Sequence, residues 1–351
     1  MNKNSLILDI GTYEMRLLQL NSVGEDGISL EKCFAVATPR EFLATSYFEE
    51  PILDERKVAD SVKSLMKSAK ISSRDVLMLL PDTSCLMETL YLEGVYSSSE
   101  IDAKIRKSFE PALQIPYERW YCSKVLTGSF NNFEIYAVML VLRKNITEIG
   151  SIVQKTGLNP ICADAAILNV ANLLEGRLSQ SNEKNTALIH LGNESSSVAI
   201  FKGSTLRFLS NRPVGACDFT LAVKAHFKLS FSEAEAFKRK EVFFLPEYTE
   251  EQELNNNFKI VKDVAVTLCE ELFATFESYF NTFRENTIDE IILSGGGANF
   301  ENLDALLRTN LNAETFQIGE LYKLYAYGKE LSQADKNVLA AASGACLRGG
   351  S

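Results

Sequence analysis

The chain has 351 residues, of which 46% are hydrophobic and 23% are charged, and its formal net charge at pH 7 is −10. This length allows two or more domains with large cores, while the acidic excess argues against a nucleic-acid-binding protein, which needs basic side chains to neutralise phosphates. No apolar run approaches the roughly 20 residues of a membrane-spanning helix, and the apolar run at residues 6–10 is too short for a signal peptide.

The seven cysteines and two histidines offer little for metal or nucleophilic chemistry. No two cysteines have the spacing of a metal site or a redox pair. Scattered free thiols of this kind are typical of a reducing compartment, so we expect a cytoplasmic protein. Neither His190 nor His226 has neighbours in the sequence that suit a zinc site or a Ser-His-Asp triad.

Residues 6–20 predict a strand, a short turn and a second strand. Apolar residues flank a polar turn that begins at Gly11. The backbone N–H groups of such a turn can bind a phosphate, with the Thr12 hydroxyl as a further donor. Asp9, at the end of the first strand, can hold Mg²⁺ through water. The alternative is an ordinary hairpin in which Asp9 only caps the turn.

Residues 85–163 predict a small inserted unit. An amphipathic helix over residues 54–69 precedes it. Apolar runs and helical periodicity then alternate in the order β-α-β-β-α-β, which is the pattern of a split βαβ unit. We expect this unit to interrupt a larger fold.

Residues 187–201 repeat the opening hairpin. His190 stands where Asp9 stands in the first hairpin, and Gly192 stands where Gly11 does, so the two hairpins lie 181 residues apart. A duplicated strand–turn–strand predicts two similar lobes that face each other across a cleft. Two glycine turns on facing lobes can bind one phosphate chain from both sides.

A charged helix and a long apolar helix follow the second hairpin. Ser232 is a candidate N-cap for a helix that carries Glu235 and Lys238, whose charges on most helices only coat a solvated face. Residues 261–283 carry a long apolar stripe at helical spacing, which predicts core packing.

Three consecutive glycines stand near the C-terminus, at residues 295–297. The apolar run at 291–293 predicts a buried strand, and leucines at helical spacing follow from Leu303. A strand, a glycine turn and a helix bring bare N–H groups and a helix N-terminus to a phosphate, although a simple tight turn is the alternative. The P-loop motif is absent and the G-x-G-x-x-G pattern is incomplete, which disfavours those two nucleotide folds. An alanine-rich helix over residues 336–347 is expected to pack closely on a neighbour.

Together, the two hairpins, the insert and the glycine run resemble the actin-like ATPase superfamily. Within it the chain resembles the PilM family of type IV pilus assembly proteins and, more distantly, the division protein FtsA. The matching stretches span nearly the whole chain: residues 8–11, 79–81, 155–158, 213–215, 232–238, 293–297 and 344–349.

The resemblance implies a bilobed α/β fold of the actin-like ATPase type, with duplicated mixed sheets and an inserted β-α-β-β-α-β subdomain. The first lobe comprises residues 1–84, 164–182 and 336–351. The insert comprises residues 85–163. The second lobe comprises residues 183–335, with a smaller subdomain at about 219–262.

The resemblance also implies ATP or ADP, with Mg²⁺, in the central cleft. The first phosphate loop is then formed by Asp9, Gly11, Thr12 and Tyr13, and the second by Gly192, Asn193 and Glu194. Gly295, Gly296 and Gly297 lie along the sugar and α-phosphate, and Glu235 and Lys238 approach the ribose or base.

The implied partner is a PilN-like inner-membrane protein, whose short cytoplasmic N-terminal tail members of the PilM family bind. With other pilus components they form a ring or platform, and the resemblance also implies a homo-oligomer or ring of this chain. It places the chain in the cytoplasm, peripheral to the inner membrane through its partner. No nucleic-acid partner is implied.

The sequence departs from the family where ATP hydrolysis takes place. His190 stands at a position that is usually acidic, and an imidazole cannot hold the water shell of Mg²⁺ as a carboxylate does. Ala166 stands where relatives often carry a second acid. We therefore expect nucleotide binding with weak or absent hydrolysis and assign no catalytic residue. His190 can equally be a core histidine that faces no ligand.

Three hypotheses remain at this stage. The first is a nucleotide-binding scaffold that recruits a membrane protein's tail to an exposed groove on the lobe formed by the N-terminal region and the insert at residues 85–163. The second is a true ATPase or a sugar-kinase-like enzyme, for which Asp164 is the one clear candidate base. The third is a degenerate interaction module without nucleotide, which His190 and the bulky Tyr13 favour.

Overall fold

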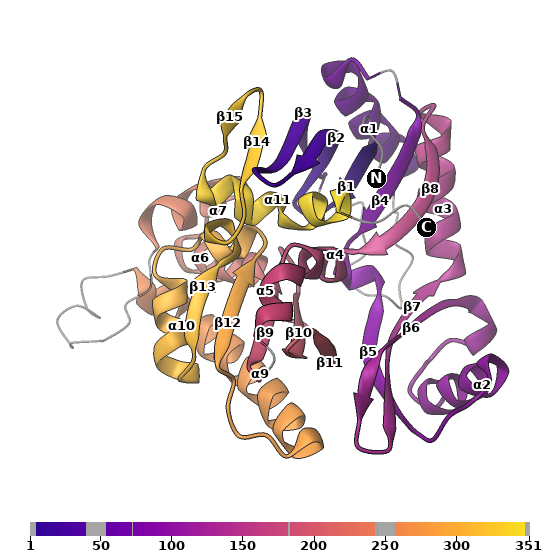
Figure 1. The fold of residues 1–351 in the computed structure, drawn as a ribbon. Coiled ribbons are helices and arrows are strands. Elements are labelled where there is room, and N and C mark those ends of the chain that lie inside the picture. Colours follow the sequence, from indigo (N-terminus) through magenta and orange to yellow (C-terminus); the bar gives the residue numbers. More distant parts are fainter. Residues whose placement is uncertain are drawn as a thin grey trace.

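Two large mixed sheets, a small third sheet and the helices packed on them make up the fold (Figure 1). The computed structural model describes residues 5–39, 54–71, 73–181, 183–242, 244 and 257–347. Parts of the predicted ranges 1–84, 219–262 and 336–351 therefore lie outside the described residues.

The first large sheet has the strand order β15-β14-β3-β2-β1-β4-β8. Its strands are β1 (Leu6–Ile10), β2 (Glu14–Gly24), β3 (Gly27–Ala37), β4 (Asp75–Leu80), β8 (Asn159–Ala165), β14 (Leu324–Ala326) and β15 (Lys329–Glu330). β1 pairs antiparallel with β2 and parallel with β4. Leu6, Ile7, Leu8 and Ile10 are all buried, which is why β1 reads as a nearly continuous apolar run.

The second large sheet repeats this arrangement, with the order β11-β10-β9-β12-β13. Its strands are β9 (Asn185–Leu191), β10 (Ser196–Lys202), β11 (Thr205–Arg212), β12 (Glu290–Ser294) and β13 (Glu314–Gln317). The β9–β10 hairpin has β12 as its parallel neighbour, just as the β1–β2 hairpin has β4. The predicted duplication of mixed sheets is therefore confirmed.

Two helices, α4 (Ala166–Asn172) and α11 (Gln333–Cys346), pack against each other and contact both large sheets. Their backbones meet at Gly344, where a Cβ atom would lie 1.8 Å from the carbonyl oxygen of Asn169. The close packing predicted for the last helix is confirmed. The helix begins three residues before the predicted start because Ser332 caps it, accepting a hydrogen bond from the Asp335 amide.

Other helices lie on the large sheets or on one another. On the first sheet lie α1 (Glu55–Ala69) and α3 (Arg143–Lys155). The short helix α5 (Glu175–Gln180) leads into the second sheet, on which α9 (Phe258–Phe283) and α10 (Leu303–Leu311) lie. α6 (Ala216–Phe227) packs on α9, and α7 (Phe231–Glu241) packs on α6. The predicted apolar stripe of α9 packs in the core of the second lobe, except Phe273, which was predicted with it and is 54% exposed. The N-cap of α7 is Ser230 and not the predicted Ser232, because Ser230 Oγ accepts from the Glu233 amide. Short 3-10 turns are η1 (Asp82–Ser84), η2 (Tyr117–Arg119), η3 (Gly296–Asn299) and η4 (Ile318–Glu320).

The insert has the predicted element order, but its last two elements pack elsewhere. A three-stranded sheet, β5-β7-β6, comprises β5 (Leu86–Glu93), β6 (Trp120–Phe130) and β7 (Phe133–Leu142), and shares an apolar cluster with α2 (Ser98–Phe109). β8 pairs in parallel with β4, so α3 and β8 extend the first large sheet. We therefore propose that the insert ends after β7.

The boundary at residue 335 also differs from the strand pairing. β14 pairs in parallel with β3, and β15 pairs with β14, so residues 324–330 belong to the first sheet. We propose that the chain returns to the first lobe before β14. None of the helices in the described ranges combines the length and apolar character that a bilayer crossing requires.

Candidate functional site

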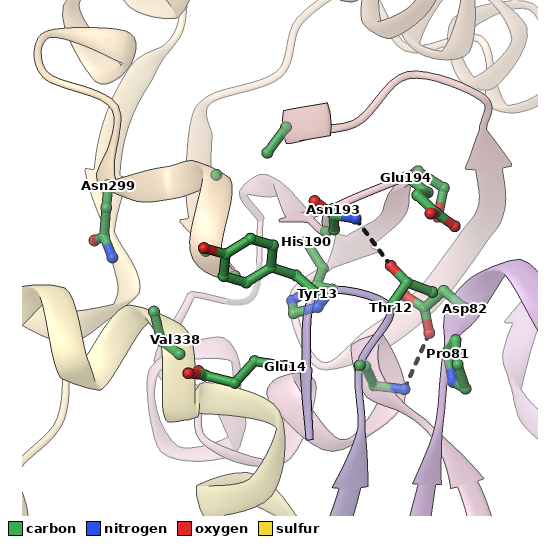
Figure 2. Close-up of a pocket in the computed structure, with 18 of the residues that line it drawn as sticks. Thr12, Tyr13, Glu14, Pro81, Asp82, His190, Asn193, Glu194, Asn299 and Val338 are labelled. Carbon is green, nitrogen blue, oxygen red and sulfur yellow. Dashed lines mark hydrogen bonds between the residues drawn. The ribbon is translucent and has the colours of Figure 1, made fainter. Parts of the chain in front are cut away.

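A cavity of about 570 Å³ lies between the two large sheets, and all twelve predicted site residues line it. They are Asp9, Gly11, Thr12, Tyr13, Gly192, Asn193, Glu194, Glu235, Lys238, Gly295, Gly296 and Gly297. Figure 2 shows Tyr13, His190 and Asn193 around the cavity, which we call the cleft.

The first turn, between β1 and β2, is held from behind by Thr38. The Thr38 hydroxyl donates to the carbonyl of Gly11 at 2.6 Å, and its amide donates to the carbonyl of Tyr13 at 2.9 Å. The Thr12 hydroxyl accepts a hydrogen bond from Asn193 Nδ2 at 3.3 Å (Figure 2). The first and second turns are therefore in direct contact across the cleft.

The second turn, between β9 and β10, is fixed by the start of α6. The carbonyl of Gly192 accepts from the Ala216 amide at 2.9 Å, and the carbonyl of Asn193 accepts from the Cys217 amide at 2.6 Å. A Cβ atom on Gly215 would lie 2.4 Å from the Asn193 carbonyl oxygen, so only glycine allows this approach. The turn is thus positioned by the helix that follows the hairpin.

The three glycines of the third turn have different roles. Gly295 has a φ of +88°, and a Cβ atom on Gly297 would lie 2.3 Å from Leu191 Cγ, so both are explained by the tight turn itself. A Cβ atom on Gly296 would have no heavy atom within 4 Å. Gly296 therefore lines the cleft with open space beside it, as a residue next to a bound ligand does.

The predicted helix N-terminus does not follow the glycines directly. Residues 296–299 form the 3-10 turn η3, and α10 begins only at Leu303. The third turn is anchored to α11, because the Gly295 amide donates to the Asn337 carbonyl at 3.0 Å and Asn337 Nδ2 donates to Asn299 Oδ1 at 2.8 Å. The ligand-facing groups on this side are those of a glycine turn and not of an α-helix.

Glu235 and Lys238 form a buried ion pair in the wall of the cleft, not a solvated face. Lys238 Nζ lies 2.6 Å from Glu235 Oε2, and the hydroxyl of Thr220 donates to the same oxygen at 2.6 Å. Arg239 Nε contacts Glu235 Oε1 at 2.7 Å. Burial opposes the charge, yet Lys238, Thr220 and Arg239 together hold the pKa of Glu235 below its ordinary value.

Asp9, the predicted Mg²⁺ ligand, is already paired. Arg16 stands opposite Asp9 on the neighbouring strand, and its Nη1 lies 3.0 Å from Asp9 Oδ2. Arg16 Nη2 lies 2.8 Å from a carboxylate oxygen of Glu14. One guanidinium thus neutralises part of the charge of two carboxylates at the edge of the cleft.

Asp82 is a carboxylate of the cleft that the sequence did not single out. It follows Pro81 at the end of β4; its Oδ1 accepts from the Ala166 amide at 3.1 Å and its Oδ2 accepts from the Ser197 hydroxyl at 2.5 Å. Burial raises the pKa of Asp82, although the nearby His190 and these two hydrogen bonds oppose the shift. Asp82 therefore joins the two lobes at the floor of the cleft.

His190 lies at the cleft and also has a partner within its own sheet. Its Nδ1 is 3.0 Å from Ser294 Oγ on β12. His190 therefore lines the cavity while one of its ring nitrogens is bonded within the protein.

The comparison with protein families decides the classification. A model of the family described as type IV pilus assembly protein PilM matches residues 7–349, nearly the whole chain. The chain belongs to the PilM family.

Solved structures agree with this assignment. A structure of the PilM–PilN type IV pilus biogenesis complex aligns with a TM-score of 0.78 and 20% identity, over 97% of this chain and 97% of that one. The ethanolamine utilization protein EutJ from Carboxydothermus hydrogenoformans aligns with a TM-score of 0.54 and 11% identity, over 97% and 88%. MreB5 of Spiroplasma citri bound to ADP aligns with a TM-score of 0.52 and 11% identity, over 98% and 95%. This PilM-family chain therefore has the actin-like ATPase fold that its sequence predicted.

The sequence did not single out five charged residues that line the cleft of this PilM-family chain: Glu14, Arg16, Asp82, Arg239 and Glu301. Arg16, Asp82 and Arg239 matter most for its chemistry. Each had a signal. Arg16 follows the first turn at the spacing at which a hairpin returns to Asp9, Asp82 directly follows a buried strand, and Arg239 stands four residues after Glu235, within reach on the same helix face.

Proposed function

We propose that this chain is a nucleotide-binding scaffold of a type IV pilus, or related secretion, platform at the inner membrane. In this role it binds ATP or ADP in the cleft with weak or no hydrolysis, and it recruits the cytoplasmic tail of a PilN-like membrane protein. The observation that carries the nucleotide part is the convergence of three turns from both lobes on one cavity. MreB5 structures of the same fold are bound to ADP and to AMPPNP, which favours this ligand class.

The residues of the cleft suit a phosphate chain. The first two turns face each other at the Thr12–Asn193 contact, and Gly296 leaves open space on the third. Close approach of bare backbone to a phosphate is what glycine turns allow. The same residues support weak hydrolysis, because His190 and Ala166 replace the acids that the family resemblance implies, and no residue is assigned to orient an attacking water.

Calorimetric titration of ATP and ADP into the purified full chain tests nucleotide binding. Gly296→Asp places a carboxylate in the open space of the cleft without backbone strain, so we expect it to abolish binding. Gly150→Asp, at an equally open position on α3, is the charge-matched control and is expected to bind like the parent. Equal affinity in all three proteins would place the nucleotide elsewhere. A folded parent that binds neither nucleotide would favour the interaction module without nucleotide.

A phosphate-release assay separates the scaffold from a true ATPase. We expect release by the parent to match that of Gly296→Asp, which is the background of the assay. Release well above that background, lost in Gly296→Asp, would overturn the scaffold hypothesis in favour of the enzyme.

The partner peptide is proposed to bind beside a free sheet edge of the first lobe or the insert. β6 and β8 are edge strands, and each exposes a large apolar side chain: Val125 is 60% exposed and Ile161 is 61% exposed. An extended peptide can add to such an edge through its backbone, while side chains of this kind give specificity. The PilM–PilN complex of the aligned structure supports a partner of this class.

A labelled peptide with the N-terminal sequence of the PilN-like partner, measured by fluorescence anisotropy, tests this surface. We expect Ile161→Glu or Val125→Glu to weaken binding at least tenfold, about 1.4 kcal/mol. Phe273→Glu, on the exposed face of α9 in the second lobe, is the control. If only Phe273→Glu weakens binding, the peptide binds the second lobe and not the proposed sheet edges.

Fractionation of cells with and without the partner tests the proposed peripheral location at the inner membrane. Measurement of the size of the complex in solution tests for a ring.

A further inference from the structure

We infer that the cleft holds no Mg²⁺ of its own and binds its nucleotide without requiring the metal, with Arg16 providing the fixed positive charge beside the phosphates. This inference rests on the proposed nucleotide binding and concerns the same site. It disagrees with the Mg²⁺ site that Asp9 predicts, and the disagreement comes from the ion pairs of the cleft.

Asp9, the carboxylate that is predicted to hold Mg²⁺, already forms an ion pair with Arg16. Mg²⁺ binds oxygen ligands in octahedral geometry and is usually held by one or two carboxylates together with phosphates and water. Asp9 has its Oδ2 at 3.0 Å from Arg16 Nη1, and both side chains are largely buried, at 13% and 14% exposure. A divalent ion at Asp9 would lie close to the guanidinium, and at this depth the repulsion is poorly screened.

Two other candidate ligands of the cleft, Asp82 and His190, also have partners of their own. Both oxygens of Asp82 accept hydrogen bonds, from the Ala166 amide and the Ser197 hydroxyl. The matching position in the second hairpin is His190, whose Nδ1 is bonded to Ser294. Glu194 lines the cleft on the second turn, and across the described ranges no three His, Cys, Asp or Glu side chains come together as a metal site built from protein ligands alone.

Three of the carboxylates that line the cleft are already paired with cations. Arg16 pairs with Asp9 and Glu14, and Lys238 and Arg239 pair with Glu235. A free divalent ion is attracted by an excess of negative charge, which these pairs reduce beside the first turn and in the wall of the cleft.

Arg16 is suited to contact a phosphate while it keeps its present partners. A guanidinium carries five N–H donors, and the contacts to Asp9 and Glu14 engage Nη1 and Nη2 only. Lys238 is less available, because its Nζ contacts Glu235, the Ala216 carbonyl and the Thr220 hydroxyl. The strands of the first hairpin therefore place one cation, ready to donate, next to the first turn.

Two measurements on the full chain test the inference. The first is calorimetric titration of ADP and of ATP in excess MgCl₂ and again in EDTA, for which we expect dissociation constants within about threefold of each other. The second is titration of Mn²⁺ alone, followed by electron paramagnetic resonance, for which we expect no tight site in the parent.

Arg16→Gln is the decisive variant. It frees Asp9 and Glu14, so we expect it to weaken nucleotide binding in EDTA at least tenfold, to regain affinity when MgCl₂ is added, and to gain a Mn²⁺ site. Arg106→Gln is the matched control, because Arg106 also stands between two carboxylates, Glu110 and Glu118, on the insert.

The outcomes separate this inference from the proposed function. Nucleotide affinity that rises tenfold or more with MgCl₂ in the parent overturns the inference and leaves nucleotide binding intact. A folded parent that binds no nucleotide under either condition overturns the proposed nucleotide binding; the Mn²⁺ titration then still decides whether the cleft holds a metal of its own. A tight Mn²⁺ site in the parent, lost in Asp9→Asn, overturns the inference in either case.

Discussion

The Arg239 guanidinium lies over the ring of Tyr13, 5.1 Å from its centre, and so joins α7 of the second lobe to the first turn of the first lobe. Because the Arg239 side chain is 62% exposed, this cation–π contact contributes about 0.5–1 kcal/mol. It explains why a bulky aromatic residue stands in a turn that otherwise suits small side chains.

Tyr13→Leu removes the ring and should loosen the mouth of the cleft. We expect faster amide hydrogen exchange in the first turn and in α7, with a free energy of unfolding lowered by no more than about 1 kcal/mol. Tyr13→Phe keeps the ring and should behave like the parent in both measurements. Equal exchange rates in the Leu and Phe variants would show that the stacking does not hold the lobes.

The buried pair of Glu235 and Lys238 should depend on both partners. Lys238→Met leaves the carboxylate of Glu235 buried beside only an exposed guanidinium and a hydroxyl, so we expect a loss of about 3 kcal/mol in urea denaturation. The double variant Glu235→Gln, Lys238→Met removes both charges and should recover a large part of that loss. A double variant as unstable as the single one would mean that the pair contributes by packing and not by charge.

Asp82 makes the stability of the fold depend on pH. Burial raises the pKa of this carboxyl above its ordinary value of 3.8 in the folded protein, so the folded state holds its proton more tightly than the unfolded chain does. The stability that this proton provides is present below pH 3.8 and is lost as pH rises through the folded pKa.

Asp82→Asn should therefore be the more stable protein at neutral pH, since an amide can still accept from the Ala166 amide and can donate to Ser197 Oγ. The difference from the parent should shrink as pH falls towards 3.8. Urea denaturation at a series of pH values measures it, with Asp60→Asn on the exposed face of α1 as the control. A gap that widens on acidification would contradict the assignment.

Gly344→Ala tests the contact between α4 and α11. The added methyl would lie 1.8 Å from the carbonyl of Asn169, so the helices must separate, and we expect a loss of about 3 kcal/mol or more. Gly150→Ala, in the middle of α3 with no atom near its Cβ position, should instead gain about 0.5–1 kcal/mol. Thermal unfolding of the two variants should move in opposite directions.

The sequence predicted those parts of the fold that depend on local pattern. The hairpins at Asp9 and His190 were recognisable because each combines an apolar strand with a glycine turn, and their repetition predicted the two lobes. Gly295, Gly296 and Gly297 were placed at the cleft for the same reason, and all the candidate residues line one cavity.

What the sequence did not predict depends on partners far apart in the chain. β8 belongs to the first large sheet because it pairs with β4, which no local pattern encodes. Asp82 is joined to the second lobe by the hydrogen bond from Ser197, which is 115 residues away in the chain. A helix with alternating charges suggested a solvated face at Glu235, but folding turns that residue towards Lys238 and Thr220 in the wall of the cleft.

The contact of α4 with α11 at Gly344 has a mechanical consequence for the two lobes. Backbone touches backbone there, between the sheets, so we expect this contact to act as a hinge that lets the lobes rotate but not separate. When one lobe rotates about a hinge, the parts beside the hinge move least and the parts farthest from it move most. Any widening of the cleft is therefore largest at the end where Tyr13 meets Arg239 and smallest at the end where the two helices cross.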